Sequence, residues 1–156
     1  MQRRSSIPLL IGALAICLAQ SAVAEDTSQP FTDHDLARLL DNHTRGVIYL
    51  WSPHMSYSVR GAAEAQRVVD GLGLVSVLLL DPHAEPALVA SVRRSHRLPD
   101  SATRRMRASA LWDIGATQHY PTVVVFASGR LDAQMLPGYT PPGDLRAYIR
   151  QRLQDF

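Results

Sequence analysis

The side chains of this chain that are best suited to chemistry follow an apolar run and form one eight-residue segment. The segment reads Trp-Ser-Pro-His-Met-Ser-Tyr-Ser over residues 51–58, between the apolar run 46–50 and a helical pattern. Its thioether, imidazole, hydroxyl and aromatic groups could hold an apolar peptide, ligate a soft metal or supply an activated serine. Thiol chemistry is not available to it, because the one cysteine of the chain is Cys17.

Metal binding and hydrolysis are the two chemistries that the residue types suggest first. A copper site would use Met55 with His54 and His119, since thioether and imidazole groups suit Cu(I). The other four histidines show no ligand spacing. A hydrolase would pair Ser56 or Ser58 with His54, but the chain lacks a Gly-x-Ser-x-Gly elbow and an evident oxyanion arrangement. We keep copper as an alternative function and set hydrolysis aside.

The first 24 residues have the pattern of a secretory signal peptide. Arg3 and Arg4 precede an apolar core over residues 7–18, and Ala-Val-Ala at 22–24 is a small-x-small cleavage site. We therefore expect an exported, periplasmic protein whose mature chain covers residues 25–156. Two alternatives remain: the leader is retained as a membrane anchor, or the chain is lipidated at Cys17. A lipobox has a small residue directly before its cysteine, whereas this chain has the large Ile16 there.

The composition of residues 25–156 predicts one domain that depends on its hydrophobic core. Two of the 16 basic residues lie in the leader, which leaves 14 against 14 Asp and Glu. This near-neutral balance argues against a nucleic-acid partner. Without Cys17 the mature chain has no disulfide, which an exported protein would be free to use.

Hydrophobic periodicity predicts an α-β-α-β order, a helical region, and then β-β-α. The apolar run 74–80 is long enough to lie at the centre of a sheet that is covered on both faces. The expected helices are 32–42, 58–71, 86–97, 100–114 and 141–153, and the expected strands are 47–51, 74–80, 121–126 and 131–136, the last two as an antiparallel hairpin.

This order and three local features resemble the thioredoxin-like superfamily. The features are the Trp51 segment, the stretch Gly-Ala-Thr-Gln-His-Tyr-Pro-Thr at 115–122, and the glycines Gly129 and Gly138. The resemblance implies an α/β, thioredoxin-like fold with a central mixed sheet and flanking helices. The chain departs from the family between Asp81 and Pro121, where we expect an extra helical insertion, about residues 84–114, before the strand that follows a cis-proline.

The same resemblance places Met55 and Ser58 where the family has its two cysteines. A second register, with residues 52–55 in place of Cys-Pro-His-Cys, also leaves no cysteine. Disulfide exchange needs a thiolate, so we expect a redox-inactive protein with no catalytic residue. The resemblance further implies a cis Tyr120–Pro121 bond that faces residues 54–58.

A groove at this position would hold an extended peptide, unless it is a vestige kept for folding. Its candidate residues are Trp51, His54, Met55, Tyr57, Ser58, Tyr120 and Pro121. The expected function is a non-catalytic periplasmic binding or assembly protein. Cysteine-free members of the family occur in conjugative transfer and secretion machinery. By analogy alone, such a machinery is the setting that we expect for this protein. The alternative is a copper-binding protein, and the third reading is an oxidoreductase that uses a partner's thiols.

An arginine-rich stretch within the insertion is the one strong charge asymmetry of the chain. Six arginines face a single acid, Asp100, over residues 93–107. Such a cluster is either a solvated surface or a docking site for an acidic periplasmic protein or for membrane headgroups. The docking candidates are Arg93, Arg94, Arg97, Arg104, Arg105 and Arg107.

Overall fold

The structure of the chain, a computed structural model, describes residues 29–156. The expectations about the leader, its cleavage and Cys17 therefore lie outside the described residues. Within residues 29–156, no helix has both the length and the apolar character needed to cross a bilayer.

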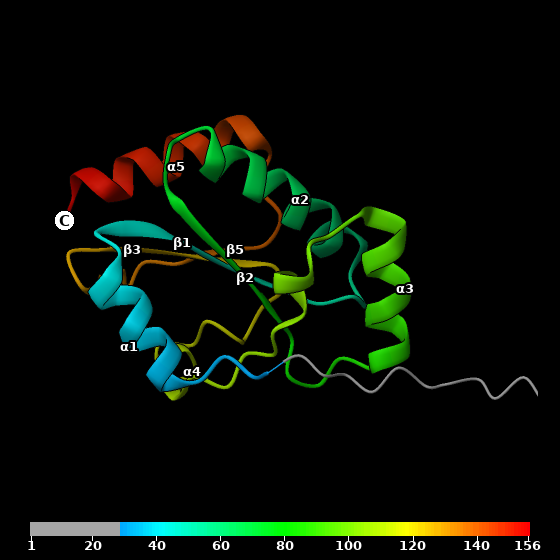
Figure 1. The fold of residues 1–156 in the computed structure, drawn as a ribbon. Helices are drawn as coiled ribbons and strands as arrows, with labels where there is room; N and C mark the ends of the chain where they lie inside the picture. The colour runs from blue at the N-terminus through cyan, green and yellow to red at the C-terminus, as the bar shows by residue number, and fades with distance from the viewer. Residues whose placement is uncertain (1–28) are drawn as a thin grey trace, which may run out of the picture.

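A mixed β-sheet with helices on both faces forms this part of the chain, which confirms the predicted fold class (Figure 1). The strands have the order β2-β1-β3-β4, and β5 lies off this path and pairs with the first two residues of β3. Strand β1 pairs parallel with β2 and antiparallel with β3. The elements are α1 (Asp33–Asn42), β1 (Arg45–Trp51), α2 (Ser56–Asp70), β2 (Val75–Leu80), α3 (Pro86–His96), the 3-10 helix η1 (Asp100–Thr103), α4 (Ser109–Asp113), β3 (Thr122–Ala127), β4 (Arg130–Leu131), β5 (Leu136–Pro137) and α5 (Pro142–Gln154).

Two hydrophobic cores lie on opposite faces of the sheet because successive side chains of a strand point to opposite sides. Val47, Tyr49 and Trp51 of β1 belong to the core that α2 and α5 cover. Ile48 and Leu50 belong to the core that α1 and α4 cover. Figure 1 shows these two pairs of helices on either side of the sheet. The central strand is therefore buried on both faces.

Strand β2 lies at the edge of the sheet, so its predicted central position was wrong. It has β1 on one side, and on the other side a single bridge joins Leu80 to Arg105. Its last three residues, Leu78 to Leu80, are nevertheless buried. The apolar run 74–80 thus predicted burial correctly, but a buried strand does not need a neighbouring strand on each side.

The predicted helix 100–114 was also wrong, because extended backbone divides it into η1 and α4. The Leu80 N–H donates to the Arg104 carbonyl at 2.9 Å, and the Met106 N–H donates to the Leu80 carbonyl at 3.0 Å. The Met106 side chain is fully buried in the α1-side core. Pairing with the sheet edge therefore overrides the helical preference of this segment.

The predicted return strand 131–136 is interrupted after Leu131 and resumes at Leu136. Asp132 is buried at the interruption, where its N–H donates to the Val125 carbonyl at 2.8 Å and its carboxylate accepts the Gln134 N–H at 2.9 Å. Its carboxylate also accepts a hydrogen bond from Arg152 of α5 at 3.0 Å. A buried, paired acid thus turns the chain between β4 and β5.

Candidate functional site

Residues 51–58, from the end of β1 to the first turn of α2, bury a tryptophan and present a thioether and a phenol to solvent. Trp51 is fully buried, and its Nε1–H donates to the Ala102 carbonyl at 2.8 Å. Met55 occupies the N-cap position of α2, which begins at Ser56 rather than at the predicted Ser58. Met55 is 48% exposed and Tyr57 is 62% exposed, so both are available for binding.

Ser58 serves as an internal hydrogen-bond partner. It is fully buried, and its Oγ accepts the Ser52 N–H at 2.9 Å. The Ser52 hydroxyl in turn donates to Asp81 Oδ2 at 3.0 Å, and the same carboxylate accepts the His83 N–H at 2.9 Å. This chain of contacts ties the start of α2 to the ends of β1 and β2. No hydrogen bond within residues 29–156 joins His54 to a serine, so the geometry gives no support to a hydrolase site.

The loop before β3 lies opposite Met55 and contains the Tyr120–Pro121 bond, which is cis. The Gly138 N–H donates to the Pro121 carbonyl at 2.7 Å, and the Thr122 hydroxyl donates to the His119 carbonyl at 2.6 Å. Tyr120 is partly buried, and this burial, with a contribution from the Asp81 charge, raises the pKa of its phenol. The loop is thus fixed to β5 on one side and to β3 on the other.

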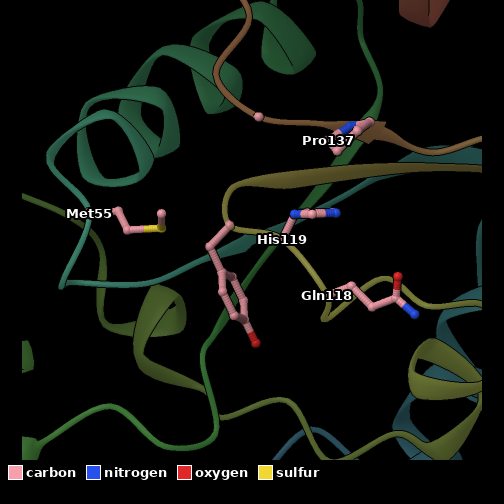
Figure 2. Close-up of a pocket in the computed structure, with 6 residues that line it drawn as sticks. Met55, Gln118, His119 and Pro137 are labelled. Carbon is pink, nitrogen blue, oxygen red and sulfur yellow. The ribbon is translucent and has the colours of Figure 1, made fainter.

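An open groove of about 450 Å³ runs between these two segments (Figure 2). Met55 forms one wall, while residues 118–120 and the Pro137–Gly138 turn form the others. Of the seven predicted groove residues, Met55 and Tyr120 line it. Trp51, Ser58 and Pro121 are buried, and the exposed His54 and Tyr57 do not line it. The sequence thus led to the two segments that the fold brings together, but it did not lead to Gln118, Pro137 or Gly138.

An aromatic pair that sequence reasoning missed fixes the turn after β5 to α2. The rings of Tyr57 and Tyr139 lie 5.5 Å apart, and the Tyr139 hydroxyl donates to Glu64 Oε2 at 2.8 Å. Arg60 donates to the other oxygen of Glu64 at 3.0 Å, and its guanidinium lies 5.4 Å from the Tyr139 ring centre. Burial acts to raise the pKa of Glu64, but the two donors outweigh it and lower that pKa.

The only sequence signal for this contact is Gly138, which ends β5 with a φ of +83° that favours glycine. The positive φ turns the chain so that Tyr139 comes to lie against α2. The position of this groove wall therefore depends on a contact between side chains from distant parts of the sequence.

Two of the three predicted copper ligands share the groove. Met55 and His119 both line it, whereas His54 does not. The imidazole of His119 points away from Met55 in Figure 2. Within residues 29–156, no three His, Cys, Asp or Glu side chains are grouped so that they could hold a metal ion.

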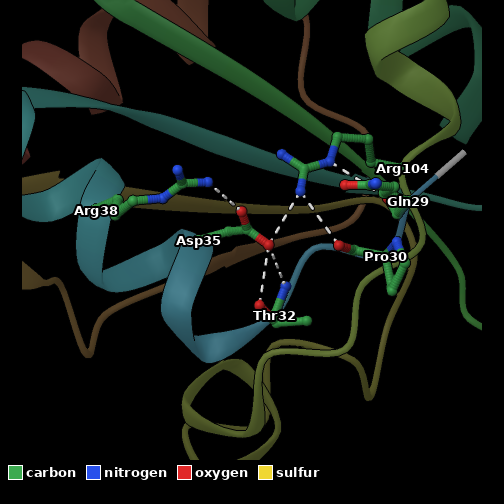
Figure 3. Close-up of polar contacts among 6 residues, drawn as sticks. All are labelled: Gln29, Pro30, Thr32, Asp35, Arg38 and Arg104. Carbon is green, nitrogen blue, oxygen red and sulfur yellow. Dashed lines mark hydrogen bonds and ion pairs between the residues drawn. The ribbon is translucent and has the colours of Figure 1, made fainter.

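The six arginines of residues 93–107 divide into two sets. Arg93 pairs with Asp100, and Arg104 bonds Asp35 at 3.0 Å and the carbonyls of Gln29 and Pro30 (Figure 3). Arg105 donates to the carbonyls of Asp81, Pro82 and Ala84, the last at 2.7 Å. The side chains of Arg94, Arg97 and Arg107 are exposed and form no hydrogen bond or ion pair with the described residues. Three of the six thus hold the fold together.

Solved structures provide the comparison, because no protein-family model matches the sequence and no curated protein sequence matches it. MTB dsbF, solved in its mixed oxidized and reduced forms, superposes with a TM-score of 0.52 at 12% identity, over 70% of this chain and 81% of that chain. The pneumococcal exposed lipoprotein thioredoxin Etrx1 from Streptococcus pneumoniae strain TIGR4 has a TM-score of 0.52 at 14% identity, over 72% of this chain and 89% of that chain.

The chain has a thioredoxin-like fold. The likeness concerns the fold alone at this level of identity, and it confirms the architecture that the three sequence features implied. In this thioredoxin-like fold the groove lies between the start of α2 and the cis-proline loop.

Proposed function

We propose that this chain is a non-catalytic, exported thioredoxin-like protein that holds an extended peptide segment in the groove between Met55 and residues 118–120. The observation that supports it most is at Tyr120. Its backbone N–H and C=O take part in no hydrogen bond with the described residues, although the loop on either side is fixed. Such a pair of free groups beside an apolar wall is what a peptide in extended conformation requires.

The chemistry of Met55 and Ser58, which the resemblance places at the family's cysteine positions, supports a binding role without catalysis. The Met55 thioether cannot lose a proton, and the Ser58 hydroxyl is buried with its oxygen already bonded to the Ser52 N–H. Neither group can attack a disulfide. The polarizable thioether of Met55 does suit apolar peptide side chains, because methionine adapts its shape to different partners.

We extend this proposal to the setting of the protein. An exported binding module without thiols fits a role in assembly, with a conjugative transfer or secretion apparatus as the system in which to look for its partner. The partner would then be a periplasmic protein, and contact with a membrane would be peripheral or through the leader.

Selection of peptides on the immobilised protein tests the groove. Phage-displayed peptides would be selected on residues 25–156, and the enriched ones labelled for fluorescence anisotropy. Met55→Glu places a charge in the groove wall and should weaken binding about tenfold or more. Ala37→Glu adds the same charge to an exposed position of α1 and should leave affinity unchanged. Equal affinities for both variants would refute binding in the groove.

Copper binding is the second candidate, because Met55 and His119 line the same groove. Competition of the protein with a chromophoric Cu(I) chelator would measure it. A copper site requires that Met55→Leu and His119→Ala each lower the affinity, since each removes one ligand of a soft ion. Affinities equal to that of the wild-type protein would refute the copper site and leave the peptide proposal standing.

A further inference from the structure

A second cleft lies at the other end of the sheet and belongs to no part of the groove. It has a volume of about 270 Å³ and is lined by Arg45, Leu72, Leu74, Arg150, Leu153 and Gln154. These residues come from the start of β1, from the loop between α2 and β2, and from the end of α5. The three leucines are partly buried and form the apolar part of the cleft, while both arginines are exposed.

Both arginines of this cleft are free to bind an anion. The guanidinium groups of Arg45 and Arg150 form no ion pair or hydrogen bond with any residue of 29–156. Arg146 is equally without a partner there, and its guanidinium lies beside Gly71 in the neighbouring loop. Asp70, at the end of α2, is exposed close by in the chain and pairs with none of the three. We leave Arg67 out, because its guanidinium donates to the Ala63 carbonyl of the same helix at 3.3 Å.

The cleft and the groove are far enough apart to act independently. Strand β1 runs from Arg45, in the cleft, to Trp51, beneath the segment that carries Met55. Its seven residues span about 20 Å at the usual rise of a strand. One protein could therefore engage two partners at once, which is the requirement for an adaptor in an assembly.

We propose that this cleft docks an acidic segment of a partner protein, with an apolar side chain of that segment placed between the leucines. Carboxylates fit guanidinium groups in bidentate geometry, and two free arginines beside one apolar recess fit an acidic residue next to a large apolar one. A membrane surface fits less well, because the leucines are recessed and partly buried instead of projecting toward a bilayer. The proposal does not depend on peptide binding in the groove.

A designed acidic peptide tests the site on the protein of residues 25–156. The probe is a fluorescein-labelled peptide of repeated Glu-Glu-Leu, with a companion that has Ser in place of Leu, measured by anisotropy at low and moderate salt. Arg45→Gln with Arg150→Gln should weaken binding of the first peptide about tenfold at low salt. The matched control, Arg94→Gln with Arg97→Gln, removes the same charge from two exposed, unpartnered arginines at the end of α3.

The outcomes separate the possible readings. Specific loss in the Arg45 and Arg150 variant, together with weaker binding of the serine peptide, supports the proposal. Equal loss in both variants overturns it in favour of net charge alone, and equal binding of both peptides overturns the role of the leucines. The proposal of a protein partner is overturned if the protein binds no peptide but sediments with phosphatidylglycerol vesicles in a way that depends on Arg45 and Arg150. Thermal unfolding of both variants verifies that folding is unchanged.

Discussion

Arg104 Nη2 and Asp35 Oδ2 lie 3.0 Å apart, and their ion pair joins the segment after η1 to the first turn of α1. The same carboxylate accepts the Thr32 N–H at 3.0 Å and the Thr32 hydroxyl at 2.9 Å, so it caps the helix as well (Figure 3). The Arg104 guanidinium also lies 5.1 Å from the ring centre of Phe31, which is buried. The Arg104 side chain therefore connects three parts of the fold, namely the segment after η1, residues 29–31 and the first turn of α1.

Arg104→Gln should lower the free energy of unfolding by about 1 to 2 kcal/mol, because it removes the ion pair, two hydrogen bonds to carbonyls and the contact with Phe31. Arg107→Gln is the matched control from the same arginine-rich stretch. It is exposed, so its effect should stay within about 0.5 kcal/mol. Urea unfolding of the two variants measures both. Similar stability for the two variants would mean that Arg104 is only a solvated side chain.

Asp35→Asn should reduce stability most at neutral pH and progressively less in acid. Hydrogen bonding to the Thr32 N–H is the main reason that the pKa of Asp35 lies well below its usual range; burial opposes this, and Arg38 and Arg104 support it. A lowered carboxyl pKa stabilises the fold above the unfolded value of about 3.9, and this contribution is lost as the pH falls through the folded value. We expect a cost of about 1 to 2 kcal/mol near neutral pH.

Unfolding by urea at a series of pH values from neutral to acid would show the two stability curves converging below about pH 4. Asp41→Asn, in the exposed last turn of α1, should cost no stability at neutral pH, because a carboxylate at a helix C-terminus makes no favourable interaction with the helix dipole. A constant gap between Asp35→Asn and the wild-type protein at all pH values would contradict the assignment to the ionised carboxylate.

Met55→Cys with Ser58→Cys should create a reversible disulfide in a protein that has none. The two positions are three residues apart at the start of α2, so their side chains lie on the same face of the helix. The first position is exposed and at the helix N-terminus, which lowers the pKa of a thiol, and the second is buried. Replacing the Ser58 hydroxyl weakens its bond to the Ser52 N–H, and we expect a cost of about 1 kcal/mol in the reduced form.

Thiol titration and insulin reduction compare this variant with the wild-type protein of residues 25–156. The wild-type protein should show no turnover, whereas the double variant should form the disulfide and reduce insulin. Met55→Cys alone controls for one reactive thiol without a resolving one. Turnover by the wild-type protein would overturn its assignment as redox-inactive, and a double variant that cannot form the disulfide would overturn the placement of Met55 and Ser58 in the cysteine positions.

The sequence by itself determined the order of the main elements and the segments that form the groove. Apolar runs predicted β1, β2 and β3, because burial in a sheet demands such runs. The Trp51 segment and the stretch before Pro121 led to Met55 and Tyr120, which the fold places in one groove. The lack of a thiol in these segments also follows from the residue types alone.

Tertiary structure decided what each residue's neighbours are, and therefore which charges are free. Six arginines close together in the sequence suggested one docking surface, but Arg93, Arg104 and Arg105 are bonded to the fold. Arg45 and Arg150 lie far apart in the sequence and meet without partners around three leucines. Pairing between distant segments also decides the edge of the sheet. The backbone of Leu80, at the free edge of β2, bonds to Arg104 and Met106, and this pairing divides residues 100–114 into η1 and α4. Local sequence patterns predict which residues are buried and which secondary structure they prefer, whereas the pairing of distant segments depends on the whole fold.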